Sequence, residues 1–239
     1  MNIKLFVYVI IFMIMMPFKS FSCDNFLQDY IEYAKQQKDE TKKRYMFNDN
    51  LNQANKGFSG AEYNVGVMYF LGLGTNQDIS EALYWLIKSS DKRNSRASYT
   101  LGCIYYKGDG FKPNYEKAYD YFLMSSSSSN KDAEYMVAKM LKEGLGVEQD
   151  LKKSFEYMES AAKKGKSEAI KEIGNLYYNG EGIKKDNFYA YLWYKRALDD
   201  GVNDFDDEIK SLRETMKGSE IMRAERLYGK WRSSLYQKM

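Results

Sequence analysis

Residues 169–201 read AIKEIGNLYYNGEGIKKDNFYAYLWYKRALDDG, and this stretch decides the fold because the chain contains three further versions of it. The alanine that opens it recurs every 36 residues. In each version, two glycines follow that alanine at offsets of 11 and 13, and an aspartate or asparagine follows at 17. A fixed period of this length without drift is typical of stacked-repeat proteins. The recurring alanines are Ala61, Ala97, Ala133 and Ala169.

Each repeat divides into two predicted helices. In the first repeat, apolar residues at spacings of three and four predict a helix over 61–71. Gly72 can take the left-handed conformation that ends many helices, and Asp78 can cap the next helix by accepting from its free backbone amides. Small residues at 82, 89 and 90, matched at 118, 125 and 126, should let neighbouring helices approach closely. The serine run 125–129 is predicted to be a turn between repeats rather than a flexible linker.

Both ends of the array are predicted to be capping helices, because a terminal repeat has one face without a neighbour. A first helix is expected over 24–38, with Phe26, Tyr30 and Tyr33 on one stripe, and a second over 40–57. The last helix should bury Ala224, Leu227, Trp231 and Leu235. No alternating run predicts a strand, so the fold class is all-α. The predicted domains are 23–60 (N-terminal cap), 61–96, 97–132, 133–168 and 169–201 (repeats), and 202–239 (C-terminal cap).

Residues 1–22 have the pattern of a secretory signal peptide. One lysine precedes an apolar run over 5–18 that is too short to cross a bilayer, and small residues stand just before Cys23. The mature chain is therefore expected to begin at Cys23 and to reach the periplasm. A lipoprotein anchored through Cys23 is the alternative, although serine and phenylalanine occupy the leading positions of its signal. Removing Lys4 and Lys19 lowers the net charge from +3 to +1.

The composition excludes several function classes. Charges of both signs are mixed along the chain, which argues against nucleic acid and against an anionic membrane surface as partners. No later segment is long and apolar enough to span a membrane. Cys23 and Cys103 are the two cysteines, so a disulfide-stapled scaffold is excluded, and Cys103 is predicted to be a small buried side chain with a packing role only.

Catalytic chemistry has little support in the sequence. The chain contains no histidine, so Ser-His and Cys-His arrangements are impossible and a metal would depend on carboxylates. The acidic pairs at 199–200 and 206–207 are expected to be solvated helix-end charges. The Gly-x-Gly pairs lack the strand and lysine of a phosphate loop. We therefore expect no enzyme activity, no catalytic residue, no metal and no cofactor.

The repeats resemble the Sel-one-like repeat (SLR), a relative of the tetratricopeptide repeat. The version at 169–201 is nearest to its pattern, whereas the second departs at Phe111, Asn114 and Tyr121, and the third at Ala138 and Leu141. The resemblance covers about 61–201 and implies a right-handed α/α superhelix that binds other proteins. The family pattern carries no catalytic residue. The matching residues at 169–201 are Ala169, Ile173, Gly174, Tyr177, Gly180, Gly182, Ile183, Asp186, Ala190, Trp193, Ala197 and Gly201.

Two columns of aromatic residues are the candidate partner-binding surface. Residues seven apart on a helix lie on nearly one face, so the third and tenth positions of each first helix can point to the concave side of the array. Tyrosine is favoured in binding sites because it gives a large contact area at low entropic cost. The alternative is that these rings pack between repeats. The candidates are Tyr63, Tyr99 and Tyr135 in one column, and Phe70, Tyr106 and Tyr178 in the other.

These features predict an exported interaction module, monomeric before it binds another protein. The specific hypothesis, by analogy with the family, is an immunity protein that neutralises a toxin effector such as a lipase or a wall-directed enzyme. An envelope scaffold or a host-interaction factor is the alternative among binding modules. A cell-wall hydrolase or a β-lactamase-like enzyme is the alternative from another class, which the missing nucleophile–base set disfavours.

Overall fold

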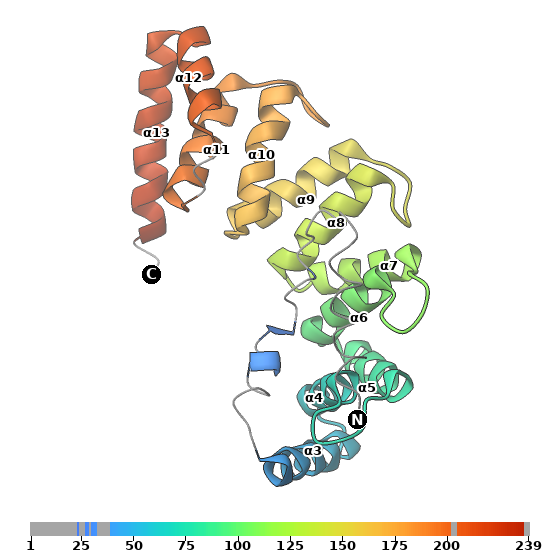
Figure 1. Cartoon of the computed structure of the whole chain (residues 1–239). Helices are drawn as coiled ribbons and strands as arrows, with labels where there is room; N and C mark the ends of the chain where they lie inside the picture. Colours follow the sequence, from blue (N-terminus) through green and yellow to red (C-terminus); the bar gives the residue numbers. More distant parts are fainter. Residues whose placement is uncertain (1–22, 24–26, 29, 33–38, 202–204, 237–239) are drawn as a thin grey trace, which may run out of the picture.

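The computed structural model describes residues 23, 27–28, 30–32, 39–201 and 205–236 of this chain. The predicted signal peptide and most of the predicted helix over 24–38 lie outside these residues. Every regular element in the described part is helical, which confirms the all-α prediction. The helices stack in chain order into a curved solenoid, with α3 at one end and α13 at the other (Figure 1).

The four repeats are four helix pairs in one constant register. The first helices of the pairs start 36 residues apart, two residues earlier than the alanine pattern suggested. Each first helix packs antiparallel on its own second helix and against the preceding pair. The pairs are α4 (Ser59–Leu71) with α5 (Ile79–Asp91), α6 (Ser95–Lys107) with α7 (Tyr115–Ser126), α8 (Lys131–Glu143) with α9 (Leu151–Lys163), and α10 (Ser167–Asn179) with α11 (Asn187–Asp199).

The predicted start and stop signals act as expected. Gly72 ends α4 in the left-handed region at φ +68°, and its counterparts end the other first helices in the same way. The Asp78 carboxylate accepts from the Glu81 amide at 3.0 Å and so caps α5. The small residues predicted at close approaches are buried, and the Ser89 hydroxyl donates to the Ser59 carbonyl at 2.7 Å. Of the serine run, residues 127–129 form the turn between α7 and α8, whereas Ser125 and Ser126 are the last residues of α7.

In three of the four repeats, the second glycine of the loop lies directly against the backbone of a preceding helix. A Cβ built on Gly146 would overlap the backbone of Tyr115 at the start of α7, so only glycine lets this loop rest on the preceding pair. Gly74 meets Lys43 in the same way, and Lys43 lies two periods before Tyr115. Helix α3 (Glu40–Asn55) therefore takes the place of the second helix of a preceding repeat.

The C-terminal end is covered by α12 (Asp206–Thr215) and α13 (Gly218–Tyr236). Trp231 packs edge-on against Trp193 of α11, with ring centroids 5.1 Å apart, and Ala224 is fully buried. The predicted stripe is wrong at Leu227, which is 43% exposed, because Tyr228 faces α11 in its place. The Tyr228 hydroxyl donates to the Asp199 carboxylate at 2.5 Å. The side chain of Leu235 lies outside the described set.

The prediction for the cysteines was wrong in one respect. Cys103 on α6 is fully buried, as expected, but it forms a disulfide with Cys23, with Cα atoms 5.4 Å apart. The two residues are 80 positions apart, and their spacing in the sequence does not predict the pairing. Packing alone is therefore not the role of the Cys103 sulfur, because it ties the start of the described chain to the second repeat. A thiol held in this bond cannot also carry a thioether lipid.

Candidate partner-binding face

The six candidate residues lie on α4, α6, α8 and α10, the first helices of the four repeats. The structure buries two of the six candidates almost completely: Tyr63 is 7% and Tyr135 is 4% exposed. The other four are half-buried and pack against the main core. The half-buried candidates are Phe70, Tyr99, Tyr106 and Tyr178.

Tyr63 is covered by a second part of the chain. The ring of Tyr30 stands edge-on to it with centroids 6.0 Å apart, and the Tyr30 hydroxyl donates to the Asn64 side-chain oxygen. Asn64 in turn donates to Asn50 of α3 at 2.8 Å. Tyr63 is consequently part of an internal contact, and no accessible ring is left there for a partner.

Tyr135 is held by polar neighbours on the next repeat. Its hydroxyl donates to Glu172 at 2.8 Å, and Lys139 and Lys166 lie over its ring at 5.6 and 5.7 Å. Burial and the adjacent Glu172 carboxylate raise the pKa of Tyr135 well above its usual range. This tyrosine therefore joins α8 to α10.

Tyr99 and Tyr106 share one aromatic neighbour. Both rings pack on the buried Phe122 of α7, with centroids 5.7 and 6.5 Å away, and Tyr106 also meets Tyr115 at 5.5 Å. Burial raises the pKa of Tyr106 well above its usual range. Each ring therefore has one packed face while part of it remains exposed to solvent.

The tenth-position column lies beside the loops and changes its chemistry along the array. Tyr178 packs on Tyr194 and carries the Lys185 ammonium 4.8 Å above its ring. The third member of the column is Lys142, which pairs with Glu181 at 3.1 Å. The column thus holds three aromatic residues and one lysine that is paired with a carboxylate, an arrangement suited to a protein surface of mixed character.

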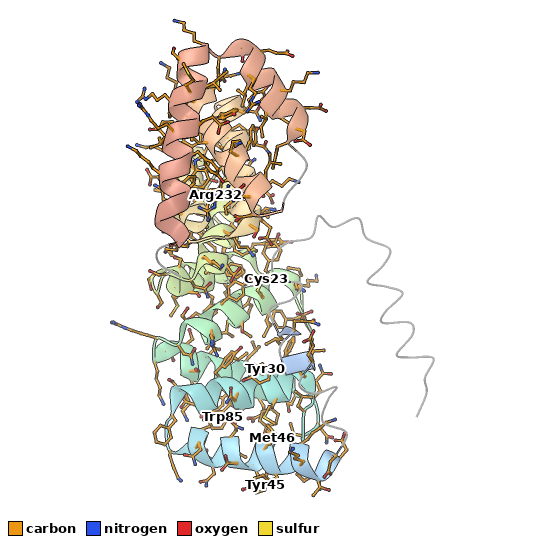
Figure 2. The ribbon with its side chains drawn as sticks, turned by 90° about the vertical axis from the view of Figure 1, so that its left-hand side faces the viewer. Cys23, Tyr30, Tyr45, Met46, Trp85 and Arg232 are labelled. Carbon is orange, nitrogen blue, oxygen red and sulfur yellow. A yellow bond between two sulfur atoms is a disulfide. The ribbon has the colours of Figure 1, made fainter. Side chains whose placement is uncertain are left out.

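The sequence reasoning missed a strap on the inner side. We define the N-terminal strap as the described residues Cys23, Leu27, Gln28 and 30–32. Figure 1 draws it in blue on the inner side of the bend, and Figure 2 places Cys23 and Tyr30 along one side of the array. Leu27 is 4% exposed and belongs to the same core cluster as Tyr63 and Val67. The one available signal was a pair of cysteines behind a predicted export signal, because disulfides form in exported proteins.

Two buried carboxylates occupy equivalent places in the first and third repeats. Glu62 is fully buried and accepts from Lys92 at 2.7 Å, and Glu134 accepts from Lys164 at 2.6 Å. These pairs join the two helices of a repeat and compensate the charge. The Ser160 hydroxyl of α9 also donates to Glu134 at 3.1 Å, so this carboxylate accepts two hydrogen bonds from the second helix of its repeat and the residue after it.

The described residues hold no group of three or more histidine, cysteine, aspartate or glutamate side chains placed to bind a metal ion. The hollows at the two ends of the array are polar. One lies between α3 and the loop after α4, where Arg44 and Asn76 contribute to its lining, and the other lies beside Lys184 and Glu220. No helix among the placed residues is long and apolar enough to span a bilayer.

The comparisons agree with this architecture. The Sel1 repeat model matches residues 59–94, 95–130, 131–166 and 167–202, which is more than half of the chain. The chain therefore belongs to the Sel1 repeat family. These repeats mediate protein–protein interaction, and family members are typically non-enzymatic scaffold proteins.

Individual relatives share only part of their length with this chain. A putative Sel1-like repeat-containing protein of Acanthamoeba polyphaga mimivirus is 44% identical over 41 residues, which is 17% of this chain and 7% of that protein. A Sel1 repeat protein from Oxalobacter formigenes has a TM-score of 0.59 and 28% identity, and the match covers 62% of this chain and 61% of that one. A protective antigen of uropathogenic Escherichia coli with an SLR fold has a TM-score of 0.46 and 19% identity over 87% and 67% of the chains.

Proposed function

We propose that this protein is an exported immunity protein that binds and neutralises a toxin effector in the periplasm. It acts as a rigid interaction module, without chemistry of its own. The observation that supports export is the Cys23–Cys103 disulfide, because disulfides form and persist in oxidising compartments. The same bond disfavours a lipid anchor at Cys23, since the sulfur is already used. The toxin as partner rests on analogy with the family.

The proposed contact strip consists of the half-buried tenth-position rings beside the loops, which are Phe70, Tyr106 and Tyr178. Tyr106 and Tyr178 each have one face fixed by packing, so little conformational entropy is lost when a partner covers the other face. The ion pair of Lys142 and Glu181 supplies charged groups that can favour one partner over another. Tyr63 and Tyr135, which were candidates from the third-position column, are excluded as partner contacts because they are buried.

A capture experiment tests the partner class. The chain from Cys23, purified oxidised, is mixed with the product of the adjacent gene, and growth is followed when that product is exported with and without this chain. Binding together with restored growth supports the immunity role. Binding without any effect on growth would favour an envelope scaffold, and hydrolysis of peptidoglycan or nitrocefin by the chain alone would contradict the non-enzymatic proposal.

The contact strip is tested on the same complex. Tyr106→Ala and Tyr178→Ala should each weaken binding by about 2 kcal/mol or more if the rings are interface anchors. The melting temperature is measured in parallel, because loss of packing lowers stability without changing the affinity of the folded fraction. Tyr135→Phe is the matched control, since that buried ring should not reach a partner. Unchanged affinity in both alanine variants would move the site away from this strip.

A further inference from the structure

The inner side of the first two repeats differs from an ordinary solvent-facing helix surface. Val67 on α4 and Cys103 on α6 occupy the same place in their repeats, one period apart, and both are fully buried. Tyr63, one turn before Val67, is nearly buried as well. What covers them includes the chain's own strap, because Leu27 and Cys23 belong to the same buried cluster.

The strap contacts this surface in the way that a short peptide ligand would. Its residues make a helical turn, in which the Ile31 amide donates to the Leu27 carbonyl at 3.0 Å and Gln28 donates to Glu32 at 3.1 Å. That turn presents two aliphatic side chains, Leu27 and Ile31, and one aromatic side chain, Tyr30. Leu27 fills the apolar part, and Tyr30 places its ring against Tyr63 and its hydroxyl against Asn64.

We propose that the inner side of α4 and α6 is a ligand groove that the chain itself occupies, with the N-terminal strap as a ligand in cis and the Cys23–Cys103 bond as its latch. The groove takes a helical turn that carries a leucine and a tyrosine three residues apart. The groove is formed by residues other than those of the contact strip, so this inference goes beyond the proposed function, and its test needs no partner protein.

The latch decides whether the groove is closed. A covalent tether makes rebinding of the strap intramolecular, so a few side-chain contacts suffice to keep it in place. Opening the latch is a two-electron exchange with a dithiol reductant. One reductant thiolate attacks a sulfur of the Cys23–Cys103 bond, and the second displaces the remaining cysteine from the mixed disulfide. Two protein thiols and an oxidised reductant result, and the two reductant protons pass to the cysteines. Because both sulfurs are fully buried, the exchange must follow a transient lifting of the strap.

The first experiment separates the strap from the groove. A protease site is inserted between Lys38 and Asp39 of the chain that begins at Cys23, and the oxidised protein is cleaved. The disulfide should keep the strap attached until a dithiol is added, after which size exclusion and mass measurement should show its release. A strap that stays bound after reduction would overturn the role of the latch.

The second experiment asks whether the vacated groove recognises the strap. The probe is a labelled peptide of residues 23–38 that carries Cys23→Ser, and its binding is followed by fluorescence anisotropy. It should bind the strap-free protein about tenfold or more tightly than the oxidised, strapped protein, and a Tyr30→Ala version should bind about tenfold more weakly. Equal binding to both proteins, or no binding to a strap-free protein that is still helical, would overturn the proposal.

Hydrogen exchange on the uncut chain tests whether reduction exposes only the groove or unfolds the whole protein. Adding the dithiol should raise exchange in 60–71 and 96–107 and leave 167–199 unchanged, because distant repeats are only weakly coupled. Uniformly faster exchange would show that the strap is a structural part of the array, and unchanged exchange would show that it is not a lid. Either result contradicts the proposal.

Discussion

The inner side of repeats one and two and the inner side of repeats three and four are formed by equivalent helices but carry different side chains. In repeats one and two, equivalent positions hold Val67 and Cys103, which the strap helps to cover. In repeats three and four, the same positions hold Lys139 and Asn175. There Lys139 lies over the ring of Tyr135, and Asn175 accepts from Tyr194 at 2.8 Å.

This difference shows how a repeat protein separates scaffold from surface. The glycines, caps and small buried residues recur in every repeat because they determine how one pair stacks on the next. The inner positions recur at the same period but hold different residue types, so their neighbours differ from one repeat to the next. The inner side of the first two repeats accepts a segment of the chain itself, whereas Lys139 and Asn175 contact tyrosines of their own repeats.

The largest expected effect comes from removing the Cys23–Cys103 disulfide, which lies in the half of the array that contains repeats one and two. Cys23→Ser should lower the free energy of unfolding by about 3–4 kcal/mol, because a cross-link that closes a long loop reduces the entropy of the unfolded chain. Urea unfolding of the oxidised protein and the variant measures this difference. Under a dithiol the two should become nearly equal. A loss shared equally by helices α10 and α11 would contradict the separation of the two halves.

A smaller effect is expected at the junction between the halves. Gly146→Ala should destabilise the protein by about 3 kcal/mol, because alanine is strained at φ +68° and its Cβ would overlap the Tyr115 backbone. Gly144→Ala is the matched control. It has the same φ, but its nearest neighbour would be 3.5 Å away, so only the backbone strain of about 1 kcal/mol should remain.

Both glycine variants are compared by urea unfolding and by hydrogen exchange on each repeat pair. Gly146→Ala should also uncouple the halves, so that they unfold in separate steps. Equal losses in the two variants would show that the loop of the third repeat does not depend on close approach to α7.

The smallest effect is the part of the alkaline pH dependence that comes from Tyr30 of the strap. Burial, and to a lesser degree the neighbouring Tyr63, raises the pKa of Tyr30 to about 12, while Arg96 opposes the shift. A raised folded-state pKa means that the contribution of Tyr30 is complete below about pH 10, its unfolded value, and is lost as the pH rises towards about 12. The phenolate can no longer donate to Asn64.

Carbon-13 NMR of ring-labelled tyrosine measures that titration, with Tyr30→Phe used to assign the signal. The midpoint should lie near 12 in the oxidised protein and fall towards the ordinary tyrosine value in Cys23→Ser, where the strap is no longer latched. An ordinary midpoint in the oxidised protein would show that Tyr30 is not buried against Tyr63.

The sequence by itself determined the array. The spacing of Ala61 and its counterparts, the left-handed glycines and the caps at Asp78 and its counterparts are local signals, and each acts through backbone conformation or a hydrogen bond within a few residues. Periodicity repeats those signals, so the helix pairs and their order follow from the chain alone. The stripe on α13 was harder to assign, because Leu227 and Tyr228 are both apolar enough to face α11.

Only the tertiary structure decided what the inner side of the array meets. Tyr63, Tyr99 and Tyr135 have the same place in their repeats, yet one lies under the strap, one packs on Phe122 and one donates to Glu172. The Cys23–Cys103 bond likewise depends on two segments 80 residues apart arriving at the same point. Helical periodicity tells which face a residue occupies, but the partner of that face is set by the path of the whole chain in space.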